Sequence, residues 1–175
     1  KKEDSAIYLN ECRHMGLEVA VPDVNTAQMN YYPDIESGNR SPRIVYGLSA
    51  IRNVGEGIVS LLISERNSNG PFVDFYDFCE RVDLQVLNRR AIEALIKAGA
   101  FDSLGHTRQG LLASYEQIIE QTVSRRREKE MGVMTLFEVA PDDASQVFDD
   151  KILVPEIEFE RQQLLSFEKE MLGRY

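Results

Sequence analysis

The chain has 175 residues, of which 43% are hydrophobic and 28% charged, a composition typical of a globular protein with a packed core. Its net charge of −9 argues against a protein that coats nucleic acid by charge alone, and no apolar run is long enough to cross a membrane. The first residues, KKEDSAIYLNE, contain no apolar stretch of signal-peptide length. Because the chain begins without Met and stops in mid-pattern at EMLGRY, we expect a piece of a longer cytoplasmic protein.

The negative charge is unevenly distributed along the chain. Residues 1–100 carry 11 Lys/Arg and 14 Asp/Glu, a net of −3, whereas residues 101–175 carry 9 and 15, a net of −6. Any contact with nucleic acid should therefore be local and should lie in the first part of the chain.

The two cysteines, Cys12 and Cys79, lie far apart in the sequence and in helical patterns. Neither has metal-ligand spacing to His14 or His106. We therefore expect two packed thiols in a reducing compartment rather than a disulfide or a metal site.

The first predicted elements are short. Residues 3–15 place apolar side chains on one helical face, and Gly16 follows as a plausible end of that helix. Residues 17–22 alternate like a strand. Residues 23–41 are rich in Asn, Asp, Pro, Ser and Gly, which predicts a loop or a pair of short strands around the turn ESGN. The stretch RIVYGLSAI is predicted to be first extended and then helical.

Residues 44–99 predict four short helices in two pairs, a duplicated unit whose copies share a pattern rather than residues. In the first pair, a short apolar turn at LSAI and a helix reaching to residue 66 flank the sequence RNVGEG. In the second, a helix over 72–82 has a face of Phe and Val, and Asn88 caps a last helix that Gly99 closes.

A longer amphipathic helix is predicted over residues 107–131, ending at Gly132. An acidic, broken stretch at 138–154 reads as a linker, and Pro155 marks the start of a last helix from about Glu156 to Leu172. The residues expected to face inward on the longer helix are Leu111, Leu112, Tyr115, Ile118, Ile119, Thr122 and Val123.

The GEG turn leaves a fresh helix N-terminus whose first backbone N–H groups have no acceptor within the helix. Gly55 allows a left-handed backbone and Gly57 allows close approach, so together with the helix dipole they suit a phosphate oxygen. Arg52 and Asn53 stand beside them. The alternative is a glycine-rich turn that only joins two packed helices.

Asn88, Arg89 and Arg90 occupy the corresponding place in the second pair, where a second phosphate could bind. The alternative is that both arginines belong to a solvated helix face. Two helix N-termini in a duplicated frame favour a contact with the backbone of a duplex.

Three stretches, CRHMGLEVAVPDVN, GLSAIRNVGEG and LIKAGAFDSLG, together resemble the tandem helix-hairpin-helix region of the alpha subunit of bacterial replicative DNA polymerase III. The resemblance covers essentially the whole chain. It implies a mainly α fold: a tandem helix-hairpin-helix with a short N-terminal β/loop segment and flanking longer helices. The implied parts are the end of the fingers region and a connecting loop (1–43), the tandem module (44–105), the long amphipathic helix (106–131), a clamp-binding motif with an acidic linker (132–154) and a helix leading towards an OB domain (155–175).

The resemblance implies that the hairpins hold primer–template duplex and that Gly55 and Gly57 carry the backbone grip. The family's catalytic aspartates belong to a palm domain earlier in the parent chain, which would use Mg²⁺. We assign no catalytic residue, metal ligand or cofactor to this segment and expect it to be inactive alone. The implied partners are duplex DNA, the sliding clamp and other polymerase III holoenzyme subunits, with no membrane.

Leu136 and Phe137 are two large apolar residues in a stretch without helical or strand partners. They either fold back onto the helices or anchor a short peptide in a pocket of a partner. The resemblance favours the second interpretation, because the family carries Gln-x-x-Leu-Phe here as its clamp-binding peptide. The glutamine is replaced in this chain, whose five residues are Val133, Met134, Thr135, Leu136 and Phe137.

The run Arg125–Arg127, with Lys129, either touches DNA or forms the solvated end of the helix. We favour the solvated end, since acidic residues are interspersed and cations stabilise a helix C-terminus.

Three rival functions stay open. The error-prone paralogue of the polymerase fits because the clamp motif lacks its glutamine. A module of a DNA repair enzyme explains the GEG turn but not the flanks. A helical protein–protein scaffold fits the acidic charge.

Overall fold

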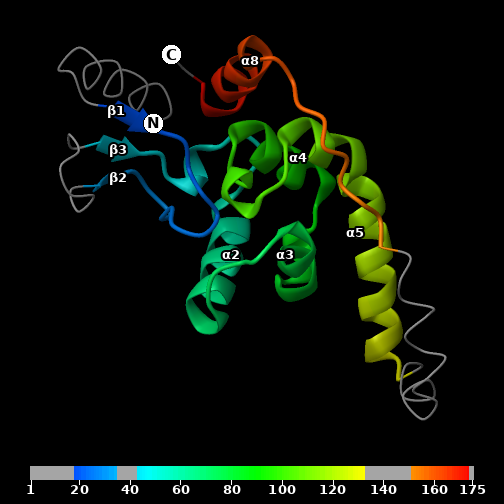
Figure 1. The fold of residues 1–175 in the computed structure, drawn as a ribbon. Helices are drawn as coiled ribbons and strands as arrows, with labels where there is room; N and C mark the ends of the chain where they lie inside the picture. The colour runs from blue at the N-terminus through cyan, green and yellow to red at the C-terminus, as the bar shows by residue number, and fades with distance from the viewer. Residues whose placement is uncertain (1–17, 35–42, 133–150, 174–175) are drawn as a thin grey trace.

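The computed structural model describes residues 18–34, 43–132 and 151–173 (Figure 1). The described chain is mainly helical, with a small sheet at its N-terminal end, as the sequence predicts. No described helix has the length and apolar character to cross a bilayer. The strands are β1 (Glu18–Ala20), β2 (Tyr32–Asp34) and β3 (Arg43–Val45); the α-helices are α2 (Glu56–Asn69), α3 (Phe75–Arg81), α4 (Arg89–Ala98), α5 (Arg108–Glu130) and α8 (Arg161–Leu172); the 3-10 helices are η1 (Leu48–Ala50), η2 (Leu84–Val86) and η3 (Asp102–Leu104).

The sheet has the strand order β1-β3-β2 (Figure 1). β1 runs parallel to β3, with Val19 opposite Ile44, and β2 runs antiparallel to β3, with Pro33 opposite Ile44. Pro33 has no backbone N–H to donate, which suits its place on an edge strand. The predicted strand within 17–22 is confirmed by β1. Of the two alternatives for residues 23–41, a loop or a pair of short strands, β2 supplies one strand; its partner β3 begins at Arg43, in the stretch RIVYGLSAI that is predicted to be first extended.

The two helix pairs are η1 with α2, and α3 with α4. The first member is only a 3-10 turn, because its start is held by the preceding loop. The Leu48 amide donates to the Gln28 carbonyl at 2.9 Å, and a Cβ on Gly47 would stand 2.5 Å from the Asn30 backbone. The duplicated pattern is therefore present with unequal copies.

Aromatic side chains form the centre of the helical core. Phe75, Phe78 and Phe101 are 0–1% exposed, and the ring of Phe101 lies 5.3 and 4.9 Å from the other two, edge to face. Cys79 is buried beside them, and that burial raises the pKa of its thiol. The prediction of a packed thiol is confirmed for Cys79; Cys12 lies outside the described residues.

The long helix α5 confirms the predicted amphipathic helix. Thr107 caps it by accepting from the Gly110 amide at 3.1 Å. Leu112 and Val123 are only partly buried; the fully buried members of the predicted face are Leu111, Tyr115, Ile118, Ile119 and Thr122.

The predicted start of the last helix is wrong, since α8 begins at Arg161 and residues 151–160 form no helix. Tertiary hydrogen bonds join this segment to α3 and to the start of α5, and Figure 1 shows it, in orange, running beside α5. The Tyr76 hydroxyl donates to the Ile152 carbonyl, the Thr107 hydroxyl donates to the Ile157 carbonyl, and the Glu158 carboxylate accepts from two amides at the start of α5. These contacts outweigh the local signal of a proline at a helix start.

The solvated interpretation of the arginine run is wrong for two of its members. Arg126 donates to the carbonyls of Cys79 and Val82 at 2.9 and 2.8 Å, and Arg125 pairs with Glu80 at 2.7 Å. Arg126 therefore stabilises the C-terminus of α3, and Arg125 joins the two helices through a partly exposed ion pair. Arg127 is exposed, as predicted.

Candidate nucleic-acid interface

The turn between η1 and α2 is the first candidate site. Arg52, Asn53, Gly55 and Gly57 are all exposed, while Val54 between them is 4% exposed and packs into the core. One buried apolar side chain thus anchors a turn whose polar and glycine positions face solvent.

The prediction of a left-handed backbone at Gly55 is wrong. Gly55 is extended, with φ −76° and ψ 159°, and Asn53 has the left-handed conformation, with φ 69°. Asparagine tolerates this conformation, so the chain reverses two residues earlier than the glycine pattern suggests. Gly55 is then the N-cap of α2.

The N-terminus of α2 has no side-chain cap. A Cβ on Gly55 or Gly57 would meet nothing within 4 Å, so packing within the described chain does not require glycine at either place. The first amides of α2 therefore have no side-chain acceptor in the described chain, and the positive end of the helix dipole lies at the same place. This arrangement can accept an anion.

A cation stands next to these donors. The Arg52 side chain is exposed and pairs with no acidic residue that the structure describes. Glu56, in the first turn of α2, carries the only acidic side chain of the turn over residues 52–57. Its carboxylate favours the helix N-terminus and would compete with a bound anion.

The second turn uses its donors within the chain. Asn88 is the N-cap of α4, as predicted, and its Oδ1 accepts from the amides of Arg90 and Ala91 at 2.9 and 3.4 Å. Two of the first amides of α4 are therefore already satisfied.

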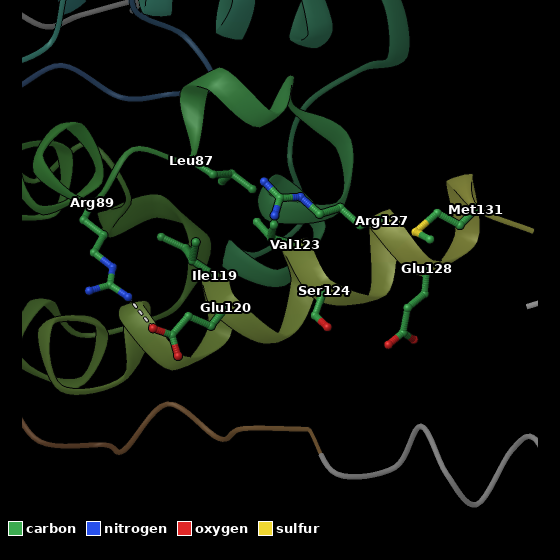
Figure 2. A pocket seen from close by; sticks show the side chains of 9 residues that line it. All are labelled: Leu87, Arg89, Ile119, Glu120, Val123, Ser124, Arg127, Glu128 and Met131. Atoms are coloured by element: carbon green, nitrogen blue, oxygen red, sulfur yellow. Dashed lines mark hydrogen bonds and ion pairs between the residues drawn. The ribbon is translucent and has the colours of Figure 1, made fainter. Parts of the chain in front are cut away.

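The two predicted arginines of this turn differ. Arg89 pairs with Glu120, as Figure 2 shows, and its other nitrogen lies 3.7 Å from the Glu116 carboxylate. Arg90 is exposed and makes no ion pair within the described part of the chain. The charge of Arg89 is thus partly neutralised.

An open groove of about 460 Å³ lies beside Arg89. One part of the groove is lined by Leu87 and by the ion pair of Arg89 with Glu120. The other part is lined by the last turns of α5 (Figure 2). Met131, at its far end, is 79% exposed. The second turn therefore borders a groove with an apolar floor and charges of both signs.

The sequence did not single out Glu116 and Glu120. They stand one turn apart on the exposed face of α5, which is a recognisable pattern for pairing with a cation. Their partner lies about thirty residues away, however, and no local signal identifies it.

Residues 133–137, the predicted clamp-binding peptide, lie outside the described residues. Among the described residues, no group of three or more His, Cys, Asp or Glu side chains is arranged to hold a metal ion.

Comparison with known proteins places these features in context. Residues 16–111 match a family model described as a helix-hairpin-helix motif. The whole chain is similar to proteins named DNA polymerase III subunit alpha: 38% identical to that of Mycobacterium tuberculosis strain H37Rv over 99% of this chain, and 37% identical to those of Haemophilus influenzae and Pseudomonas aeruginosa over 95%. The chain spans only 14–15% of the length of these relatives.

Proposed function

Because this chain belongs to the helix-hairpin-helix family and is similar to DNA polymerase III alpha subunits over nearly its whole length, we propose that it holds the backbone of duplex DNA for a bacterial replicative polymerase. The residues that carry this role are Arg52, Asn53, Gly55 and Gly57 in the first turn, with Asn88, Arg89 and Arg90 in the second. This binding of duplex DNA would take place in the cytoplasm, where a bacterial chromosome is copied.

The uncapped N-terminus of α2 is the observation that carries the proposal. Gly55 offers no side-chain acceptor, and the space where a Cβ would stand on Gly55 or Gly57 is open. Backbone donors at such a place bind phosphate oxygens without reading the bases. A polymerase must hold templates of any base composition, and contacts to phosphates do not depend on base sequence.

Nucleotidyl transfer is assigned to the parent protein and not to this segment. A DNA-directed DNA polymerase needs carboxylates that hold two divalent cations, with Mg²⁺ the expected ion. The role of this chain is to position the duplex, and it should synthesise no DNA by itself.

We also propose that residues 133–137 bind a sliding clamp. Leu136 and Phe137 would fill an apolar pocket of the clamp, and Val133 would weaken the contact because it lacks the amide of a glutamine. Tethering to a ring that encircles DNA raises the local concentration of the duplex without tight direct binding. Other holoenzyme subunits would be held through the rest of the parent chain.

Duplex binding tests the first proposal. The affinity of the chain for a short primed duplex should fall steeply between 50 and 200 mM salt, with a log–log slope of about −0.9 for each phosphate contacted. It should not change with base composition. A flat salt dependence would contradict the grip on phosphates and favour a protein–protein scaffold. A marked preference for damaged or branched DNA would favour a repair module.

The clamp proposal has its own test. Leu136→Ala combined with Phe137→Ala should abolish binding to a purified clamp while leaving the helical content unchanged. Val133→Gln should strengthen binding, because it restores the polar group of the family motif. Unchanged affinity in the double variant would mean that the clamp contacts another segment.

A further inference from the structure

The first turn is joined to the far end of the chain by a backbone hydrogen bond. The Arg52 amide donates to the Met171 carbonyl, in the last turn of α8, with an N···O distance of 2.8 Å. The side chains of Met171 and Leu172 are 5% and 9% exposed and belong to the same core cluster as Ile51 and Val54. The C-terminus of α8 therefore packs against the turn from inside and holds its backbone.

Helix-end electrostatics adds to this contact. The Met171 carbonyl is one of the last four of α8, which receive no hydrogen bond from within the helix, and the Arg52 amide satisfies it. A guanidinium nitrogen of Arg52 lies 3.9 Å from the place where a Cβ on Gly173 would stand. The negative end of the α8 dipole thus lies beside the cation of the first turn.

A buried ion pair fixes α8 in this place. The Glu168 carboxylate lies 2.7 Å from Arg108 of α5, with the two side chains 12% and 7% exposed. Arg108 also donates to the Leu164 carbonyl at 3.3 Å and pairs with Asp102 at 2.8 Å. Burial lowers the pKa of Arg108, but the hydrogen bonds and charges of Asp102 and Glu168 outweigh it and raise that pKa.

We infer that α8 positions the first turn for its phosphate, and that Glu168 is the positioning residue, acting through Arg108. Two contacts carry this effect. The ion pair of Glu168 with Arg108 fixes the position of α8, and the hydrogen bond from the Arg52 amide to the Met171 carbonyl fixes the turn relative to α8. The inference rests on the proposed function and deepens it, since it makes the grip on DNA depend on a helix about 115 residues away from the GEG turn.

Glu168→Gln in the full 175-residue chain tests this inference, with Glu170→Gln as the matched control. Glu170 is exposed on the same helix and its replacement changes the net charge equally, so general repulsion of DNA cancels. We expect Glu168→Gln to speed hydrogen exchange of the Arg52 amide at least tenfold, to weaken duplex binding several-fold, and to reduce the salt slope by about 0.9 for each phosphate that the turn no longer neutralises. Glu170→Gln should leave all three unchanged, and Glu168→Asp should restore part of each.

A second variant guards against loss of folding. Phe167→Ala removes the ring that packs against Phe159 and lies 5.1 Å from the Lys97 ammonium, and it leaves no buried charge unpaired. It should loosen α8 and act in the same direction. Faster exchange at Arg52 with unchanged affinity and salt slope would overturn the positioning role and leave the grip itself standing. A wild-type chain that binds no duplex would overturn the proposed function and this inference together.

Discussion

The N-termini of α2 and α4 differ in whether a side chain satisfies their first backbone amides. In α4, the Asn88 side chain accepts from two amides of the first turn, and the helix is capped from within. In α2, Gly55 provides no side-chain acceptor, and no described side chain caps the helix. A cap stabilises the helix and uses up its donors, whereas a bare end costs stability and keeps the donors for a ligand.

The cations of the two turns differ in the same sense. Arg52 pairs with no carboxylate of the described residues, while Arg89 is held by Glu116 and Glu120. Duplication of a helical frame has therefore not duplicated its chemistry. The first turn leaves its cation and its helix N-terminus without partners among the described residues, which our proposal requires, whereas the second holds its charges and donors largely within the protein.

Exchanging the N-cap residues is the strongest test of this difference. Gly55→Asn gives α2 a cap like that of α4, and the extended backbone of Gly55 accepts any side chain. Helix stability should rise by a few tenths of a kcal/mol. Duplex affinity should fall about tenfold, because a charge-assisted hydrogen bond worth about 1.5 kcal/mol is removed.

The reciprocal variant, Asn88→Gly, serves as the control. It removes the cap of α4 at a cost of a few tenths of a kcal/mol, and duplex affinity should change less than twofold. Urea unfolding and fluorescence anisotropy measure the two quantities. Equal losses of affinity in both variants would show that the turns contribute equally, contrary to the structure-based comparison.

Gly57→Ala should separate stability from binding at a single position. Alanine is favoured over glycine in a helix, and its Cβ meets nothing within 4 Å, so the free energy of unfolding should increase by up to about 1 kcal/mol. The same methyl group stands where a phosphate would approach, and duplex affinity should fall about fivefold, or about 1 kcal/mol. A variant that is more stable and binds equally well would mean that Gly57 serves only the helix.

Much of this arrangement could be predicted from local patterns. The comparisons confirm the resemblance to the polymerase alpha subunits, and the helix pairs, the cap at Asn88 and the inward face of α5 follow from periodicity and capping rules. Such signals depend on residues three or four apart. The local predictions are correct here because the tertiary contacts of the core favour the same structure.

Two of the three errors arose where distant contacts decide the outcome, and one is local. The local one concerns the first turn: Gly55 allows a left-handed backbone, but Asn53 adopts it, since either residue is compatible with the turn. The helix expected from Glu156 begins at Arg161, because the preceding residues are hydrogen-bonded to α3 and α5. Arg126 binds carbonyls at the end of α3, 44 and 47 residues away in the sequence. No spacing rule relates these pairs.

Freeing Arg89 from its carboxylate partners should make the second turn bind DNA more like the first turn. Glu116→Gln combined with Glu120→Gln removes both of its carboxylates and frees its charge for a phosphate. Exposed ion pairs are worth up to about 1 kcal/mol, so duplex affinity should rise about two- to fivefold and the salt slope should steepen. Glu128→Gln with Glu130→Gln, on the same helix, makes the same change in net charge. If both double variants gain equally, the effect is general repulsion and Arg89 takes no part.

A smaller effect, the pH dependence of local stability, should distinguish the second pair of helices from the first. His106 Nε2 accepts from the Phe75 amide at the start of α3, at 3.4 Å. Burial lowers the pKa of His106, Asp74 opposes that shift, and Lys151 adds to it. The unfolded chain, with a histidine pKa of about 6.5, therefore takes up the proton first as the pH falls. The stabilisation from this contact is complete above that pH and is lost below it.

Between pH 7.5 and 5.5, amide protection in α3 should accordingly decrease relative to α2, where the described residues include no histidine. His106→Gln keeps an acceptor for the Phe75 amide but does not titrate, so it should abolish the difference between the two helices. Carboxylates that titrate over the same range are common to both proteins and cancel. A difference that persists in the variant would show that His106 is not the source of the pH sensitivity of α3, and it would remove the contact of His106 with the Phe75 amide from the explanation.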